Sequence, residues 1–445
     1  MRNLILLAIL TVPAWPAEEL TAPQAVLKAL ANSPALQATT AAGKTAAART
    51  SEMRGARLPH VTYTELWQRS DNPVFVFGSL LNQRQFQSSN FDLGSLNHPP
   101  FVNNFQSQVT LDQTVYDHGF RQARLRAAEL GQSLSAEDAR ANEMTVIATV
   151  LRAYYSAALA EAQVGVSAEA VRSASADVKR AEDRLTAGFT TDADVLSIRV
   201  HMAAVREEQI RRQGELELAL ASLNEAMGIP LDSSFTLVTP LTAAVVESDA
   251  GLNMEKDAVA NGSELRLARI QIGIRDEQSR AARAALWPEA FVRGGFEADR
   301  QRFVNRGGAN WMISAGLRWN VFDGFSDRAR IRGAESEVER TRALEREAKA
   351  RTELNAKRAT LELRTTSQRI EVAGASVAMA QEGLRIIRNR YEAGLTSVTE
   401  LLRSETALLA AQTRALEAAL DQRMAAVSAE LVRGSLSKDS DVVNK

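Results

Sequence analysis

Apolar and polar residues alternate along residues 310–322. A period of two residues predicts a β-strand with one apolar and one polar face. Residues 105–116 keep the same alternation, and shorter alternating segments follow Pro59 and Pro288. The sequence therefore predicts four strands. The apolar face of the best-defined strand consists of Trp311, Ile313, Ala315, Leu317, Trp319 and Val321.

A different pattern follows each pair of strands. Apolar residues recur at spacings of three, four and seven over residues 120–187 and 326–393. These spacings predict long helices that wind around neighbouring helices, each roughly 100 Å long. A glycine-containing break ends each helix, and a second helix returns over residues 192–227 and 397–433. The sequence therefore predicts two long helical hairpins.

The same elements occur twice in the same order. Residues 104–228 align without a gap on residues 310–434, at an offset of 206 residues. A helix ending before a proline precedes the strands in each half, because proline breaks helices. We expect a first repeat at 22–228, a linker at 229–251, a second repeat at 252–434 and a disordered polar tail at 435–445. The leading helices are predicted over about 22–57 and 252–286.

Four strands with one apolar face fit two settings: a soluble sheet covered by another layer, or a barrel whose apolar face meets lipid and whose polar face lines water. The other predicted elements are rods and offer no covering layer, which favours the barrel. Trp311 and Trp319 lie near the two ends of their strand, as interfacial aromatic residues do. The first repeat carries extra residues between Pro59 and Asn104. They should extend a loop of the sheet and rest on a neighbour or in the lumen.

The N-terminus predicts export from the cytoplasm. Residues 1–17 combine one positive charge, a short apolar run and small residues, as in a secretory signal peptide cleaved near residues 14–17. No later segment is apolar enough to span a membrane as a helix. The chain of 445 residues contains no cysteine, which excludes disulfides, thiolate metal sites and a lipid-bearing cysteine. Its net charge of −1 gives no support for nucleic-acid binding.

Residues for catalysis or cofactor binding are not grouped in this sequence. The four histidines are scattered, and none has a second ligand four residues away. No glycine-rich loop ends in Lys-Ser or Lys-Thr, so the chain carries no phosphate-binding loop and no energy source. We therefore expect no enzyme activity, no cofactor and no metal site.

The two breaks between the helices share one pattern. Each has a glycine, an arginine four residues before it and an acid six residues after it. Glycine can adopt the positive φ that ends a helix, and Thr or Asp can cap the helix that follows. Each break therefore predicts the tip of a hairpin. The corresponding residues are Arg184, Gly188 and Asp194 in the first tip and Arg390, Gly394 and Glu400 in the second.

This duplicated order of strands, long helix, tip and returning helix resembles the TolC-type outer-membrane efflux family. The segments Val115-Tyr116-Asp117 and Val321-Phe322-Asp323, at the joins from strand to helix, carry the same resemblance. It covers about residues 22–434 and implies a mostly α fold with a membrane β-barrel. Three subunits would each give four strands to a twelve-stranded barrel in the outer membrane of a Gram-negative bacterium, and their helices would form a coiled-coil α-helical barrel in the periplasm. The implied partners are two further copies of the chain, outer-membrane lipid, a periplasmic adaptor and an inner-membrane transporter.

The resemblance also implies roles for the tips. They would close the tunnel as a gate, and their turns would dock the adaptor. Some members carry an arginine and an acid where this chain has Thr396 and Arg403, so its closing network must differ. We expect the tip acids to be balanced by arginines or hydrogen-bonded by Tyr391. The predicted gate residues are Arg184, Asp194, Arg390, Tyr391, Glu400 and Arg403. The predicted docking residues are Gly188, Phe189, Thr190, Gly394, Leu395 and Thr396.

The function predicted from the repeat and the resemblance is that of a passive exit duct in a tripartite efflux or type I secretion system. The alternative is a periplasmic coiled-coil scaffold without a pore, which would not need strands that expose an apolar belt to lipid. The sequence does not identify the exported substrate, because in such a system the transporter selects it.

Overall fold

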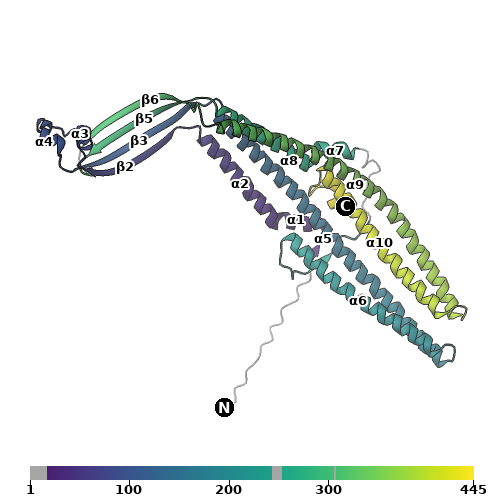
Figure 1. Cartoon of the computed structure of the whole chain (residues 1–445). Helices are drawn as coiled ribbons and strands as arrows, with labels where there is room; N and C mark the ends of the chain where they lie inside the picture. The colour runs from purple at the N-terminus through teal and green to yellow at the C-terminus, as the bar shows by residue number, and fades with distance from the viewer. Residues whose placement is uncertain (1–17, 243–252, 305–306, 445) are drawn as a thin grey trace, which may run out of the picture. The chain divides into compact units, whose positions relative to one another are not determined.

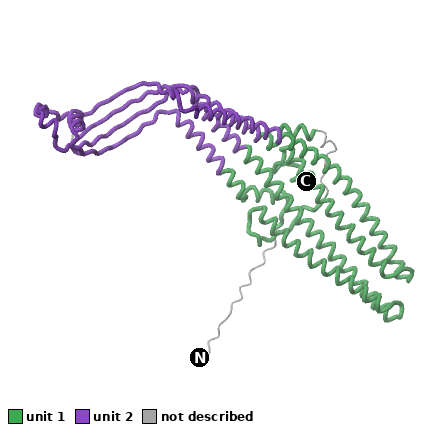
Figure 2. Tube along the Cα trace, viewed as in Figure 1, with its two compact units in different colours: residues 1–40, 137–266, 348–445 green, residues 41–136, 267–347 purple. Residues whose placement is uncertain are grey.

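The computed structural model describes residues 18–242, 253–304 and 307–444. The predicted signal peptide and most of the second half of the predicted linker lie outside these residues. The chain divides into two compact units (Figure 2). The helical unit comprises Met1–Thr40, Glu137–Arg266 and Ala348–Lys445, and the strand-bearing unit comprises Ala41–Ala136 and Leu267–Glu347.

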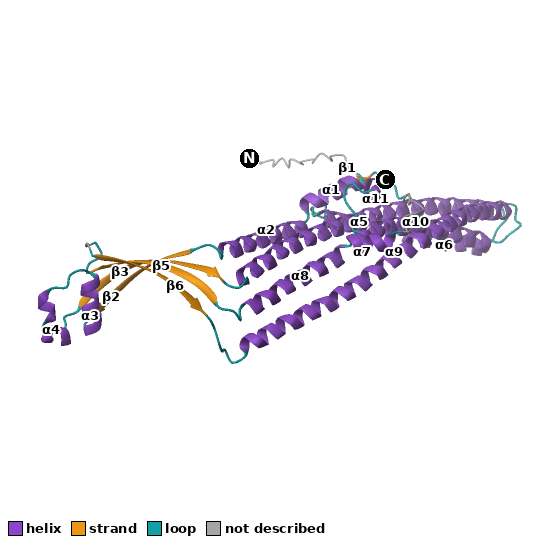
Figure 3. Cartoon of the chain, turned by 90° about the horizontal axis from the view of Figure 1, so that it is seen from above, coloured by secondary structure: helices purple, strands orange, loops and turns teal. Residues whose placement is uncertain are grey.

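The strand-bearing unit contains the four strands that the alternating pattern predicts. They form one antiparallel sheet in the order β2-β3-β5-β6 (Figure 3). Among the described residues, the outer strands β2 and β6 each have a partner on one side only. The strands are β2 (His60–Ser70), β3 (Val102–Tyr116), β5 (Glu289–Arg300) and β6 (Gly308–Arg318).

The strand register places the apolar side chains on one face of the sheet. Trp311 lies opposite Phe296, and Leu317 lies opposite Ala290. Trp311 and Leu317 are 78% and 76% exposed, so no part of the described chain covers this face there. The strand ends at Arg318 and is therefore shorter than predicted. Trp319 lies beyond its end, where the indole N–H donates a hydrogen bond to the carbonyl of Leu286 at 3.0 Å.

The residues inserted in the first repeat fold onto the sheet's polar face. They form α3 (Pro73–Asn82), the short helices η1 (Ser88–Phe91) and α4 (Leu93–Asn97), and connecting turns. Just after α3, Gln83 donates to Asn104 at 2.8 Å, and Asn104 donates to Asp299 at 2.6 Å. All three side chains are buried, and the polar face of the chain's own sheet therefore supports the insertion.

The leading helices differ from the prediction, because each is interrupted. In the first repeat, α1 (Ala22–Asn32) ends at Ser33 and α2 (Pro34–Gly55) starts at Pro34, which has no backbone N–H to continue the first helix. In the second repeat, α7 (Met254–Asn261) and α8 (Ser263–Ala284) are separated by Gly262, whose extended ψ of 127° ends the helical path.

The long helices match the predicted bounds to within a residue or two and form two hairpins (Figure 1). No helix within the described part of the chain combines the length and hydropathy of a membrane span. The first hairpin is α5 (Phe120–Thr186) and α6 (Asp192–Met227), and the second is α9 (Ser326–Glu392) and α10 (Val398–Arg433).

The core of the helical unit forms around α5. Tyr154 and Tyr155 are fully buried there. The Tyr154 hydroxyl donates to the carbonyl of Leu20 at 2.9 Å and accepts from the backbone N–H of Thr239 at 3.0 Å. Tyr154 thereby ties α5 to the parallel pair β1 (Glu18–Leu20) and β4 (Phe235–Leu237), of which β4 lies in the predicted linker.

The C-terminal tail is ordered through Asn444, which corrects the prediction of a disordered segment. Its last helix is α11 (Asp441–Asn444). Leu436 and Val443 are buried in the core around α5, at 3% and 1% exposure. The tail is polar by composition, but these two apolar side chains gain burial that offsets the entropy of ordering it.

Candidate functional site at the helical tips

Both hairpin tips end their long helix in the same way. Gly188 and Gly394 have φ values of +79° and +74°. In the first tip, Gly188 N–H donates to Leu185 and Phe189 N–H donates to Arg184, both at 2.9 Å. This is the double hydrogen bond of a Schellman motif. The second tip repeats it from Gly394 to Tyr391 and from Leu395 to Arg390.

The two predicted tip acids have different surroundings. Asp194 forms a capping box with Thr191 at the start of α6 and accepts a further hydrogen bond from Thr190 at 3.0 Å. Hydrogen bonds from Thr191 and then Thr190 lower the pKa of Asp194. Glu400 instead forms an exposed ion pair with Arg403, three residues along α10, at 3.0 Å. Asp194 therefore caps the N-terminus of α6, whereas the charge of Glu400 is balanced by Arg403.

Arg184 joins the first tip to the second. Its guanidinium lies over the ring of Tyr391, 5.4 Å from the centroid. Nη1 donates to the carbonyls of Glu392 at 2.8 Å and Tyr391 at 3.4 Å. A helix leaves its last four carbonyls without intrahelical donors and carries partial negative charge there, so a cation is well placed at this end. Arg184 thus binds the end of α9 and neither of the two acids.

The two tips also share apolar contacts. Ala181, Val195, Ile198 and Val398 are buried together, and Tyr391 packs against them. Burial raises the pKa of Tyr391. The turn residues point outward instead.

Outward-facing apolar residues occupy both turns, where docking was predicted. Phe189 is 75% exposed and Leu395 is 68% exposed. Each lies directly after the glycine of its turn, so the left-handed glycine positions them. The remaining predicted docking residues, Thr190 and Thr396, lie beside them in the same turns.

A buried polar cluster behind the tips was not predicted. Asp177 of α5 and Glu405 of α10 have side chains only 3% and 8% exposed. Arg388 of α9 donates to Glu405 and to Ser173, each at 2.8 Å, and lies 3.6 Å from Asp177. His201 of α6 lies 3.3 Å from Glu405. The cluster therefore connects all four long helices.

The two buried acids of this cluster differ in pKa. Burial, followed by the neighbouring Glu405, raises the pKa of Asp177 to about 6. Burial opposes ionisation of Glu405 too, but hydrogen bonds from His201, Asp177 and Arg388 outweigh it and lower the Glu405 pKa to about 2.

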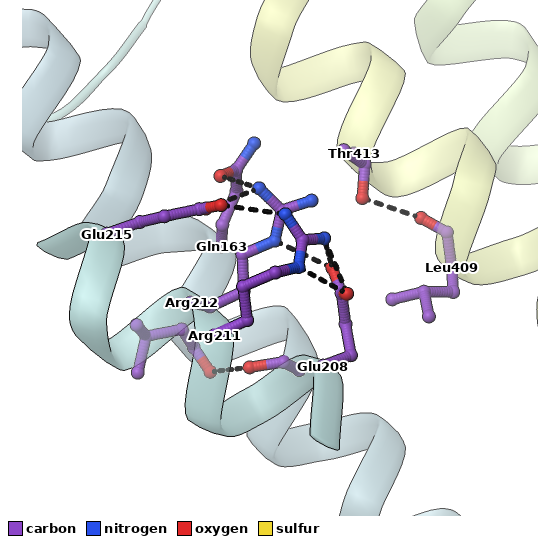
Figure 4. Close-up of polar contacts among 9 residues, drawn as sticks. Gln163, Glu208, Arg211, Arg212, Glu215, Leu409 and Thr413 are labelled. Carbon is purple, nitrogen blue, oxygen red and sulfur yellow. Dashed lines mark hydrogen bonds and ion pairs between the residues drawn. The ribbon is translucent and has the colours of Figure 1, made fainter. Parts of the chain in front are cut away.

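Further along the helices, arginines of α6 bind acids of the same helix (Figure 4). Arg211 and Arg212 both contact Glu208 and Glu215. Arg212 also donates to Gln163 of α5 at 2.8 Å, which joins the two helices of the first hairpin. In the described part of the chain, no three His, Cys, Asp or Glu residues are placed to hold a metal ion.

Three of the four residues predicted to face lipid lie on one face of β6, and the fourth lies outside the strand. Trp311, Ile313 and Leu317 project from the apolar face of β6, whereas Trp319 follows the strand. Glu65 lies on this same face of β2, and Arg300 of β5 reaches it across β3 at 2.9 Å. Because an acid and a base neutralise each other there, Glu65 does not leave an unpaired charge on the apolar face.

Two helical hairpins with joined tips and an open sheet with an exposed apolar face are the components of a channel-forming membrane protein. The chain belongs to the outer membrane efflux protein family, whose model matches residues 25–229 and 256–432. It is an outer-membrane exit channel for efflux or secretion in a Gram-negative bacterium, with a long helical periplasmic part. The family assignment agrees with the expectation that the chain is not an enzyme.

Individual relatives cover nearly the whole chain. The chain is 28% identical to Protein CyaE of Bordetella pertussis over 432 residues, which is 96% of this chain and 87% of the relative. Its fold matches a membrane protein from Pseudomonas aeruginosa with a TM-score of 0.81, 19% identity and 93% coverage of both chains. It also matches the outer membrane protein VceC from Vibrio cholerae with a TM-score of 0.79 and 17% identity, over 93% of this chain and 95% of that one.

Proposed function

We propose that three copies of this chain form the passive exit duct of a tripartite efflux or type I secretion system. The observation that carries the proposal is the sheet. No described strand pairs with the outer edge of β2 or of β6, and the apolar face is exposed. Unpaired strand edges cannot persist in lipid, because no water is present to bind their N–H and C=O groups. Three copies would supply twelve strands and could close the barrel.

In this assembly the two faces of the sheet have different environments. Trp311, Ile313 and Leu317 would meet lipid, and the opposite face would line the channel. The opposite face carries polar pairs such as Arg293 with Asp112, as a water-filled lumen requires. The insertion, which rests on the polar face, would then lie on the lumen side of the barrel.

The tips would form the periplasmic gate. Asp194 and Glu400 of three copies would place six acids around one axis, where they attract cations and repel one another. Arg403 offsets Glu400 within each copy. The contact of Arg184 with the end of α9 would hold the two tips of one copy together in the closed state.

The partners follow from what the chain lacks. The sequence carries no phosphate-binding loop, so energy would come from an inner-membrane transporter. The exposed Phe189 and Leu395 are suited to an adaptor that buries apolar side chains. The transporter would then determine the substrate.

The test combines mass and conductance. Protein purified in detergent should be a trimer by light scattering and should produce discrete conductance steps in a planar lipid bilayer. A folded, monodisperse monomer would contradict the assembly. A trimer that never conducts would favour the pore-less scaffold.

A further inference from the structure

Arg390 is the repeat counterpart of Arg184, the residue that joins the two tips of one chain. The offset of 206 residues also aligns Leu185 with Tyr391 and Thr186 with Glu392. Arg184 of the first hairpin binds the carbonyls of Tyr391 and Glu392 in the second hairpin. The carbonyls that correspond to these two acceptors therefore belong to Leu185 and Thr186 in the first hairpin.

Both members of the corresponding pair lack this contact in a single chain. The side chain of Arg390 is exposed, and its guanidinium forms no hydrogen bond or ion pair with the described residues. The Thr186 carbonyl, at the end of α5, receives no hydrogen bond from any described residue of the tip, whereas its counterpart on Glu392 accepts from Arg184. A cationic donor and a carbonyl acceptor, on different hairpins, therefore remain available.

A ring of three copies brings such a pair together. In the proposed ring, first and second hairpins would alternate, so each second hairpin would be followed by the first hairpin of the next copy. The two hairpins are repeats of one design, and the contact from first to second hairpin can recur from second to first. The C-terminal end of α5 also carries the partial negative charge that attracts a cation.

We propose that Arg390 binds the Leu185 and Thr186 carbonyls of a second copy of this chain and closes the ring of tips between subunits. The inference rests on the proposed homotrimer. This contact differs from the one within a chain in one respect. Arg184 is supported by the ring of Tyr391, but the counterpart of Tyr391 is Leu185, which offers no aromatic face. The contact between subunits therefore holds its arginine less firmly.

Cross-linking tests the proposal, because the chain has no cysteine of its own. The variant R390C/T186C places thiols at the two ends of the proposed contact. The matched control R184C/E392C places them at the aligned positions of the observed contact. Both proteins are assembled in membranes and treated with a short bis-maleimide, and the products are separated by denaturing electrophoresis and mapped by mass spectrometry.

The expected products differ between the two variants. R390C/T186C should give covalent dimers and trimers, whereas R184C/E392C should give a link within one chain. If R390C/T186C is trimeric by light scattering but links no chains together while the control links efficiently, the inference is wrong and the proposed function stands. If both variants and the unmodified protein are monomers, the proposed assembly fails and the inference fails with it.

An independent readout uses conductance. R390Q replaces the guanidinium with a shorter, neutral amide, and should increase the open fraction of the trimer several-fold. R385Q is the control, because Arg385 pairs with Glu382 on its own helix. An R390Q trimer that stays as closed as R385Q would overturn the proposal.

Discussion

Arg388 of α9 binds Glu405 of α10 at 2.8 Å, and this pair is the charge-reversed counterpart of Glu182 and Arg199 in the first hairpin. The offset of 206 residues aligns Glu182 with Arg388 and Arg199 with Glu405. The second pair also differs in its surroundings, because Glu405 is 8% exposed whereas Glu182 is 43% exposed. The repeat has thus kept the contact between helices while changing its sign and its burial.

Exchanging the two charges should have unequal effects in the two hairpins. R388E/E405R would place the new acid beside Asp177 and the new arginine beside His201, and should lower the free energy of unfolding by roughly 3–5 kcal/mol. The matched exchange E182R/R199E concerns an exposed pair and should cost less than about 1 kcal/mol. Urea unfolding in detergent, followed by circular dichroism, measures both. Equal losses would show that burial of the second pair does not matter.

The buried cluster should make stability depend on pH. Asp177 faces Arg180 on its own helix, Arg388 on α9, Glu405 on α10 and, next to Glu405, His201 on α6. Its folded-state pKa of about 6 lies above 3.8, the ordinary pKa of an aspartate carboxyl. The protonated acid therefore stabilises the fold below about pH 4, and this contribution of at most about 3 kcal/mol is lost as pH rises through 6.

The variant D177N should reduce this pH dependence. Its free energy of unfolding should change less between pH 4 and pH 7 than that of the unmodified protein. D192N, at the exposed start of α6, is the control and should retain the full dependence. If the free energy of unfolding of D177N depends on pH as strongly as that of the unmodified protein, a group other than Asp177 causes the dependence.

Removing the tip charges should change ion selectivity. D194N/E400Q removes six carboxylates from the proposed trimer, but the Asn side chain can still accept a hydrogen bond at the start of α6. D194A would instead lose the cap, at a cost of about 1 kcal/mol. We expect D194N/E400Q to reduce the preference for cations, measured as a reversal potential across a salt gradient.

The control for this experiment is E382Q, which removes a charge of α9 that pairs with Arg385 behind the turn. It should leave the reversal potential unchanged. If D194N/E400Q behaves like E382Q in selectivity and conductance, the two acids do not form the gate.

The turn at Gly394 should require glycine because of its positive φ, and not because a side chain would collide with a neighbour. A Cβ there would meet no atom within 4 Å, but φ is +74°. G394V should therefore strain each tip by about 1–2 kcal/mol and abolish export, with trimer and barrel intact. G394N should retain most activity, because Asn tolerates this conformation better. Equal export by both variants would show that export does not depend on the left-handed conformation of this turn.

A charge on the apolar face of β6 should be costly in lipid. L317R should lower the free energy of unfolding by roughly 2–4 kcal/mol if Leu317 lies near mid-membrane. S314R, on the opposite face, should cost far less, since its neighbour Arg293 is already paired with Asp112. Refolding into lipid vesicles, followed by resistance to protease, compares the two. A larger loss for S314R would reverse the assignment of the faces.

The sequence alone determined the elements and their order. Spacings of three, four and seven predicted α5 and α9 to within a residue or two, because a long helix needs a continuous apolar stripe and no proline. Alternation predicted β6, since its two faces have different surroundings. Gly188 and Gly394 marked the turns, because few other residues adopt positive φ. These are local properties, and neighbouring residues determine them.

Tertiary structure decided which distant residues meet. No local pattern shows that Arg184 binds the end of α9, or that Asp177 and Glu405 share a buried cluster, because each contact joins residues more than 200 positions apart. The tail was misjudged for the same reason. Its polar composition indicated disorder, but Leu436 and Val443 are held by a core that forms only when α5 and the strand pair β1 and β4 have come together. Burial and charge pairing are properties of the assembled helices, so the sequence specifies them only through the fold.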